Sequence, residues 1–244
     1  MRSDASAAAA GASLHPGGGV DWMATSVREA IARAIEQDIF SGTFQVGQQL
    51  KQDAICQRFN VSAAPVREAL RQLENDGLLI YRPNRGMFVA EVTTEELLGV
   101  LLPLRFTLEE FAMRYALERM NDERWGYLEE LVRTMQSGAR VCDWLTINEA
   151  DVRFHELTVL WSDQPHTMQL WKAVRSRTRA QFYRLAPRHE DPHEVADEHA
   201  YLLEQFRTGD PGVISKALRQ HIIVSADELA ANSIANPKSA TTVQ

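Results

Sequence analysis

One carboxylate and three imidazoles in this sequence are spaced so that they could share a metal ion. Asp151 and His155 stand four residues apart, which places both side chains on one face of a helix. That face also carries Phe154, so it is the face expected to be buried. His199 and His221 lie in apolar helical patterns further along the chain. A carboxylate combined with imidazoles suits zinc first, with nickel, manganese or another divalent ion as alternatives.

The same four residues could instead be ordinary core residues, since a single inward histidine is most often hydrogen-bonded to a neighbour. Four together are harder to explain in that way, because each unpaired buried polar group costs about 1–3 kcal/mol. If a metal is bound, four protein ligands could close a tetrahedral structural zinc site. They could also leave positions open on an ion of higher coordination number, where an effector carboxylate could complete the shell.

The elements that must position these residues are helices. From Thr93 onward, apolar residues recur at helical spacing, and no strand-like alternation competes with that pattern. Pro103 falls inside the first of these helices and predicts a kink. The apolar stripe expected to be buried on that helix consists of Leu97, Leu101, Leu104, Leu108, Phe111 and Tyr115. The second part of the chain is therefore predicted to be an all-α bundle.

The first part of the chain has a different organisation. A helix is expected from about Val27 until Ser41-Gly42, a short helix over 52–59, and a third from an N-cap at Ser62 to about Asp76-Gly77. Asn60 is placed where a left-handed residue is needed between the second and third helices. Short strands over 79–82 and 87–90 flank a basic turn. Three helices and such a hairpin predict a winged helix-turn-helix.

Charge is distributed unevenly between the two parts. The net charge is −7, but residues 1–91 hold 9 basic against 10 acidic side chains, whereas residues 92–244 hold 17 against 23. Local charge governs phosphate attraction, because salt screens fields beyond roughly 8–10 Å. Arg67 and Arg71 stand one turn apart, away from the apolar stripe of the third helix, and could contact phosphates or base edges.

Residues 25–91 resemble the DNA-binding domain of the GntR family. The motifs that carry the resemblance are 47–50 (GQQL), 61–62 (VS), 65–70 (PVREAL), 77–78 (GL) and the wing at 85–86 (RG). Ala63-Ala64 departs from the family, which usually has Arg-Thr after the capping serine, and this puts the usual operator sequence in doubt. The resemblance implies Arg67 and Arg71 in the major groove, Ser62 and Ala63 at the helix entry, and Arg82 and Arg85 in the wing.

Residues 93–232 resemble the FCD ligand-binding domain of the FadR subfamily, in its metal-binding type. The motifs are 151–155 (DVRFH), 198–199 (EH), 209–210 (GD) and 220–222 (QHI). The resemblance implies metal ligation by Asp151, His155, His199 and His221. It also implies that Arg105 lies near the effector, where it could grip a carboxylate. The alternative is a surface arginine paired with Glu109.

Arg175 and Arg179, one turn apart, are weaker candidates for effector binding, because a solvated basic face is the favoured alternative. The chain is thus predicted to comprise a disordered tail (1–19), a winged helix-turn-helix (20–91), a helical FCD domain (92–232) and a flexible tail (233–244). Two cysteines and the lack of an 18-residue apolar run predict a cytoplasmic protein with no disulfide and no membrane span.

The expected function is a homodimeric transcription regulator and repressor, not an enzyme. It would bind double-stranded DNA at an inverted-repeat operator, because two-fold symmetry doubles the contact made by one recognition helix. A small carboxylate metabolite and the metal would regulate it. Two other functions remain open: a metal-dependent enzyme that uses the Asp/His site, and a DNA-binding protein whose metal is purely structural.

Overall fold

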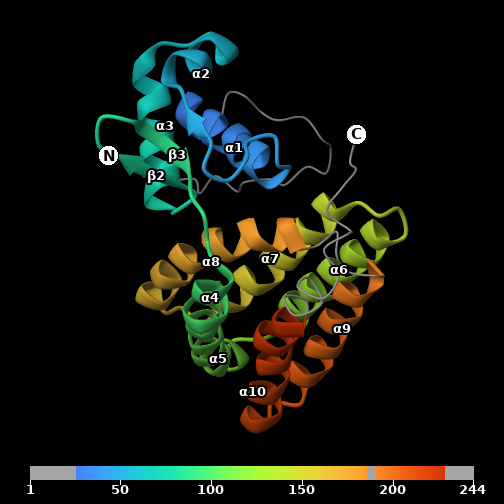
Figure 1. Cartoon of the computed structure of the whole chain (residues 1–244). Coiled ribbons are helices and arrows are strands. Elements are labelled where there is room, and N and C mark those ends of the chain that lie inside the picture. The colour runs from blue at the N-terminus through green and yellow to red at the C-terminus, as the bar shows by residue number, and fades with distance from the viewer. Residues whose placement is uncertain (1–25, 186–190, 229–244) are drawn as a thin grey trace, which may run out of the picture.

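The computed structural model describes residues 26–185 and 191–228, and within them the chain forms two parts (Figure 1). A winged helix-turn-helix of three helices and a small sheet lies at one end, and a helical bundle makes up the rest. The mostly helical fold predicted from the sequence is confirmed. The tails predicted at 1–19 and 233–244 lie outside the described residues.

The three helices of the first domain are α1 (Val27–Phe40), α2 (Gln52–Phe59) and α3 (Ala63–Asn75). A capping box begins α1, in which the side chains of Ser26 and Glu29 each accept from the other residue's backbone amide. Asn60 adopts the predicted left-handed conformation (φ 52°) between α2 and α3. Ser62 stands at the predicted N-cap of α3, but its hydroxyl makes no capping hydrogen bond, contrary to expectation.

The sheet has three antiparallel strands in the order β1-β3-β2. The hairpin pairs β2 (Leu79–Arg82) with β3 (Gly86–Val89), close to its predicted bounds. The third strand, β1 (Gln49–Leu50), was not predicted, because two residues are too few to show a periodic pattern. It joins β3 directly before α2, so it fixes the start of α2 beside the wing.

The second domain contains α4 (Thr94–Glu96), α5 (Leu102–Leu117), α6 (Asp122–Ala139), α7 (Trp144–Trp161), α8 (Pro165–Leu185), α9 (His193–Arg207) and α10 (Pro211–Arg219). Two π-helical turns interrupt it, Leu97–Leu101 before α5 and Gln220–Val224 after α10. Pro103 lies in the first turn of α5, where a missing amide is tolerated. A π-helical turn lies just before the proline.

The face of α5 that the sequence pattern predicted to be buried is partly exposed. Leu104, Phe111 and Tyr115 are 48%, 40% and 37% exposed. The inward face carries Arg105 and Glu109 instead, along with small and apolar residues. Because α5 is apolar around most of its circumference, the spacing of its leucines could not identify the inward side.

The two domains meet where α8 passes beneath α1 (Figure 1). Arg179 on α8 lies 3.6 Å from Glu36 on α1, and its guanidinium stacks 4.7 Å from the ring centre of Phe40. Ala180 packs against the apolar core of the winged helix-turn-helix. Among the described residues, no helix is both long and apolar enough to cross a membrane.

Candidate metal centre and nucleic-acid interface

The four predicted metal ligands converge inside the second domain. Nε2 of His155 lies 3.1 Å from Nε2 of His221 and 3.2 Å from Nε2 of His199. Oδ1 of Asp151 lies 2.9 Å from Nε2 of His199 and 3.6 Å from Nε2 of His155. One potential ligand atom from each of the four residues therefore faces the same point. α7 supplies two of them, α9 the third, and the π-helical turn after α10 the fourth.

The Nδ1 atom of each histidine, on the opposite side of the ring from Nε2, lies within hydrogen-bond distance of an oxygen atom. Nδ1 of His199 lies 2.7 Å from the backbone oxygen of Val195, and Nδ1 of His221 lies 2.7 Å from Oε2 of Glu198. Nδ1 of His155 lies 2.7 Å from Oε2 of Glu109. With a proton on each Nδ1, all three Nε2 atoms present lone pairs toward one another, an arrangement that a cation stabilises. The residues therefore fit a divalent metal ion.

The electrostatics of the cluster also favour metal binding. Burial alone would raise the pKa of Asp151, but hydrogen bonds from His155 and His199 hold it well below its usual value, so the carboxylate is ionised. Burial and the neighbouring His199 lower the pKa of His221 to about 4, so its ring is neutral near pH 7. Burial would lower the pKa of His155, but the nearby Glu109 raises it. A metal at this point would displace a proton from His155.

Glu109 links this cluster to two other residues. Its Oε1 accepts hydrogen bonds of 2.8 Å from Nε of Arg105 and Nε1 of Trp171. Burial would raise the pKa of Glu109, but Arg105 and His155 hold it well below its ordinary value. Arg105 is therefore paired with Glu109, as the alternative interpretation required, yet it is buried and not on the helix surface.

The other two candidate effector arginines have partners near the domain junction. Nη1 of Arg175 donates to Oε1 of Glu156 over 3.1 Å, and Arg179 pairs with Glu36 as described above. Their side chains are 27% and 15% exposed. Neither forms the solvated basic face that was the alternative interpretation.

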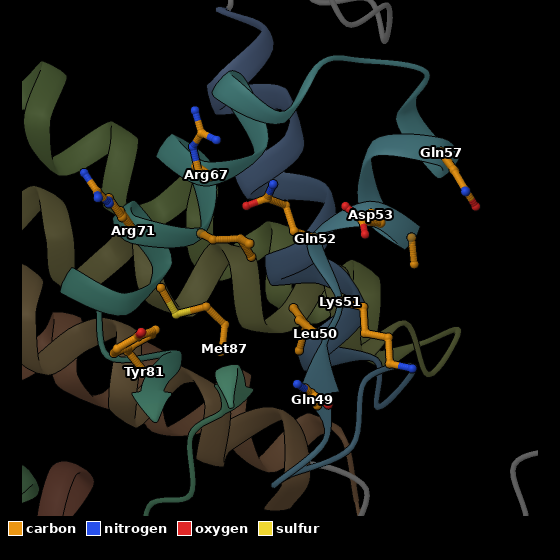
Figure 2. Close-up of a pocket in the computed structure, with 13 residues that line it drawn as sticks. Gln49, Leu50, Lys51, Gln52, Asp53, Gln57, Arg67, Arg71, Tyr81 and Met87 are labelled. Carbon is orange, nitrogen blue, oxygen red and sulfur yellow. The ribbon is translucent and has the colours of Figure 1, made fainter. Parts of the chain in front are cut away.

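The winged helix-turn-helix has a groove of about 680 Å³ between α2, α3 and the sheet (Figure 2). Arg67 and Arg71 line it from α3, as the sequence predicted for a DNA-contacting pair. Both are exposed, and neither makes a hydrogen bond or ion pair with any residue that the structure describes. Their guanidinium groups are therefore available to phosphates or base edges.

The remaining predicted DNA-contacting residues are not part of the groove lining and lie at two other places in the same domain. Ser62 and Ala63 begin α3, where Ser62 is exposed. Arg82 and Arg85 lie at the hairpin tip, with their guanidinium groups 4.6 and 5.4 Å from the ring centre of Phe88. This stacking orders two basic side chains on the wing.

Sequence reasoning missed several residues of both sites. Glu109 and Glu198 contact the metal-ligand candidates His155 and His221. Their positions on inward helix faces, near an arginine or a histidine, could have indicated this role. The groove also includes polar residues around the start of α2 and on the sheet, which the sequence could not place without the unpredicted strand β1. They are Gln49, Lys51, Gln52, Asp53, Gln57 and Tyr81.

Comparison with known proteins gives consistent results for both halves. The model of the bacterial regulatory proteins of the gntR family matches residues 27–89, and the FCD domain model matches residues 100–223. The regulator YdhC of Bacillus subtilis is 28% identical over 144 residues, 57% of this chain and 62% of that protein. The gluconate operon transcriptional repressor of Bacillus licheniformis is 26% identical over 214 residues, 85% of this chain and 86% of its own.

A solved structure described as E. coli McbR/YncC shares the fold, with a TM-score of 0.72 at 20% identity over 85% of this chain and 99% of its own. The family models cover the winged helix-turn-helix and most of the helical bundle, in the same order as the two domains of the structure. The chain therefore belongs to the GntR family of bacterial DNA-binding transcriptional regulators, which are not enzymes, and carries the FCD domain that is typical of the FadR subfamily.

Proposed function

We propose that this regulator is a metal-dependent repressor that binds an inverted-repeat operator as a homodimer and responds to a small organic acid. A repressive role is supported by the relatives named as repressors, including the gluconate operon repressor and RspR of Escherichia coli. Asp151, His155, His199 and His221 hold the divalent ion. Three imidazoles and a carboxylate make zinc the first choice, with nickel or manganese as alternatives.

The proposal of an organic-acid effector rests on the burial and incomplete hydrogen bonding of Arg105. Its side chain is only 6% exposed, yet among the described residues its hydrogen bonding uses Nε alone, toward Glu109. The two terminal amino groups of the guanidinium make no hydrogen bond within the described residues and could bind another acceptor. The ring centre of Phe182 lies 5.4 Å from Cζ of Arg105. A carboxylate matches the planar edge of a guanidinium and is also a good metal ligand. An organic acid could therefore bind between Arg105 and the metal.

A homodimer follows from the geometry of DNA reading, because one recognition helix contacts only a few base pairs. The exposed apolar face of α5 supports this assembly. Leu104, Phe111 and Tyr115 project from one side of that helix, and the rings of Phe111 and Tyr115 lie 5.0 Å apart. Exposed aromatic residues gathered on one face are typical of protein interfaces. Phe111→Asp is expected to shift the protein toward monomer in size-exclusion chromatography.

Contacts through α8 offer a physical link between effector and DNA. Trp171 on α8 donates to Glu109, which contacts the metal-ligand candidate His155. Further along α8, Arg179 contacts Glu36 and Phe40 in the DNA-binding domain. An effector that shifts α8 would therefore change the position of the winged helix-turn-helix. It regulates DNA binding only if its affinity differs between the two positions.

The experiment that tests this function is a thermal-shift screen of small mono-, di- and tricarboxylic acids, with and without a chelator. A true effector raises the melting temperature only when metal is present, and it changes the affinity for operator DNA in a gel-shift titration. Arg105→Lys should abolish the shift by the acid while retaining the metal. If the chelator lowers stability but no acid affects melting or DNA affinity, the metal is purely structural and the effector proposal is wrong.

A further inference from the structure

The groove on the DNA-binding face contains one acidic side chain. Among the residues that line the groove, Lys51, Arg67 and Arg71 are basic, and Asp53 is the single carboxylate. In Figure 2, Asp53 lies at the start of α2, across the opening from Arg67 and Arg71 on α3. A carboxylate at this position is repelled by the phosphates that the arginines attract. It therefore weakens DNA binding unless the DNA offers it a hydrogen-bond donor.

The protein itself offers Asp53 little compensation. The side chain is exposed and makes no hydrogen bond or ion pair with any residue that the structure describes. Its position in the first turn of α2 places it near the positive end of that helix, which is a modest and solvent-screened benefit. The carboxylate of Asp53 is therefore available to accept a hydrogen bond from a ligand in the groove.

Donors on DNA that could satisfy a carboxylate lie on the base edges of the major groove. Adenine presents N6 beside the acceptor N7, which repels a carboxylate, whereas cytosine presents the N4 amino group with no acceptor beside it on the same base. A carboxylate consequently favours cytosine. The paired guanine presents O6 and N7, which are the acceptors that arginine prefers. One C·G pair could thus satisfy Asp53 and one of the two arginines across the groove.

We infer that Asp53 is a specificity-determining residue, which selects a cytosine in each operator half-site by accepting a hydrogen bond from its N4 amino group. This inference rests on the proposed operator binding, with Arg67 and Arg71 in the DNA-contacting role predicted from the sequence. Ala63-Ala64 stands where the family usually has Arg-Thr, so the start of α3 lacks the family's arginine. Asp53, at the start of α2, would supply a base contact in its place.

The test is selection of bound duplexes from a random-sequence library at one fixed ionic strength, using the full-length protein. The wild type should prefer cytosine about tenfold at one position of each half-site. Asp53→Ala should lose that preference. Asp53→Asn should shift it to adenine, because an amide pairs with N6 and N7 together. Glu91→Gln, which removes an exposed negative charge outside the groove, is the matched control and should keep the wild-type preference.

Two results would overturn the inference while leaving the DNA-binding role intact. In one, both Asp53 variants keep the cytosine preference and only bind all sequences more tightly, so Asp53 acts through phosphate repulsion. In the other, the variants lower the melting temperature without changing base preference, so Asp53 serves the first turn of α2. A wild-type protein that enriches no sequence would instead overturn the DNA-binding role itself, and the inference with it.

Discussion

The candidate metal centre and the candidate DNA-binding groove differ in how far their side chains are held in place before a ligand binds. In the candidate metal centre, the side chains of His155 and His199 are almost completely buried, and each ring is oriented by a partner at its Nδ1 atom. In the groove, Arg67 and Arg71 are exposed and make no hydrogen bond or ion pair within the described structure. The candidate metal centre is therefore preorganised, whereas the groove arginines would gain their partners only from bound DNA.

The difference follows from the size of the ligand. A metal ion is a single point, so ligands displaced by a fraction of an ångström lose affinity, and a surrounding shell must hold them. DNA is long and charged, and flexible side chains can adapt to it while many phosphate contacts accumulate. Substitutions in the metal centre should therefore have large effects, and single substitutions in the groove moderate ones.

Removing one metal ligand should have the largest effect. His221→Ala is expected to reduce bound metal from about one ion per chain to nearly none, since three ligands on the remaining helices no longer enclose the ion. The melting temperature should then become insensitive to a chelator. Elemental analysis after dialysis measures the first result, and calorimetry the second. His166→Ala, at an exposed histidine, is the matched control, and wild-type metal content in His221→Ala would remove this residue from the site.

Removing a partner behind a ligand should have the next largest effect. Glu198→Gln weakens the hold on Nδ1 of His221 and disturbs the hydrogen bond from Ser225. The affinity for zinc should fall about tenfold, measured by competition with a chromogenic chelator. Asp197→Asn removes an exposed negative charge one residue away and should leave the affinity unchanged. If both variants lose affinity equally, long-range charge and not orientation is responsible.

A groove substitution should act on DNA alone. Arg67→Ala is expected to weaken operator binding about tenfold at matched salt, with a shallower dependence on salt if the lost contact is to phosphate. Bound metal should remain at the wild-type level. Arg114→Ala, an exposed arginine on α5, provides the comparison in both gel-shift and metal assays. Unchanged DNA affinity in Arg67→Ala would mean that the groove does not face the operator.

The sequence predicted the metal-ligand candidates better than it predicted the residues around them. Helical spacing of four residues was enough to place Asp151 and His155 together, and the apolar helices around His199 and His221 turned those side chains inward. The partners on the far side were not predictable, because Glu109 meets His155 only through tertiary packing of α5 on α7. The bounds of α2 were predicted correctly, but the two-residue strand β1 that positions its start was missed, because so short a strand leaves no periodic signal.

The exposed face of α5 shows a further limit of sequence patterns. Its apolar residues follow a helical spacing as regular as that of a buried stripe, but burial there depends on which side faces the neighbouring helices. Arg105 and Glu109 lie on the inward side because they pair with each other, and Glu109 also contacts His155 and Trp171. A pattern based on hydrophobicity alone excludes such a charged pair from the core.

The smallest effect on stability is expected at the junction between the two domains, where Glu36 on α1 contacts Arg179 on α8. Burial raises the pKa of Glu36 above its ordinary value of 4.5, despite the opposing effect of Arg179 and Arg175. A raised carboxyl pKa means that the folded state binds the proton more tightly than the unfolded chain. Ionisation of Glu36 therefore reduces stability as the pH rises through 4.5 to the folded-state pKa, and the loss persists at higher pH.

Glu36→Gln removes this cost while keeping the shape of the side chain. At pH 7 the variant should be as stable as the wild type or more stable, by less than about 1 kcal/mol in urea unfolding. Below pH 4.5 the difference should disappear, because Glu36 is then protonated in both states. Glu95→Gln, at an exposed glutamate, controls for the loss of one charge. A variant that is less stable at pH 7 would show instead that the ion pair with Arg179 outweighs burial, and that charge attraction holds the DNA-binding domain against α8.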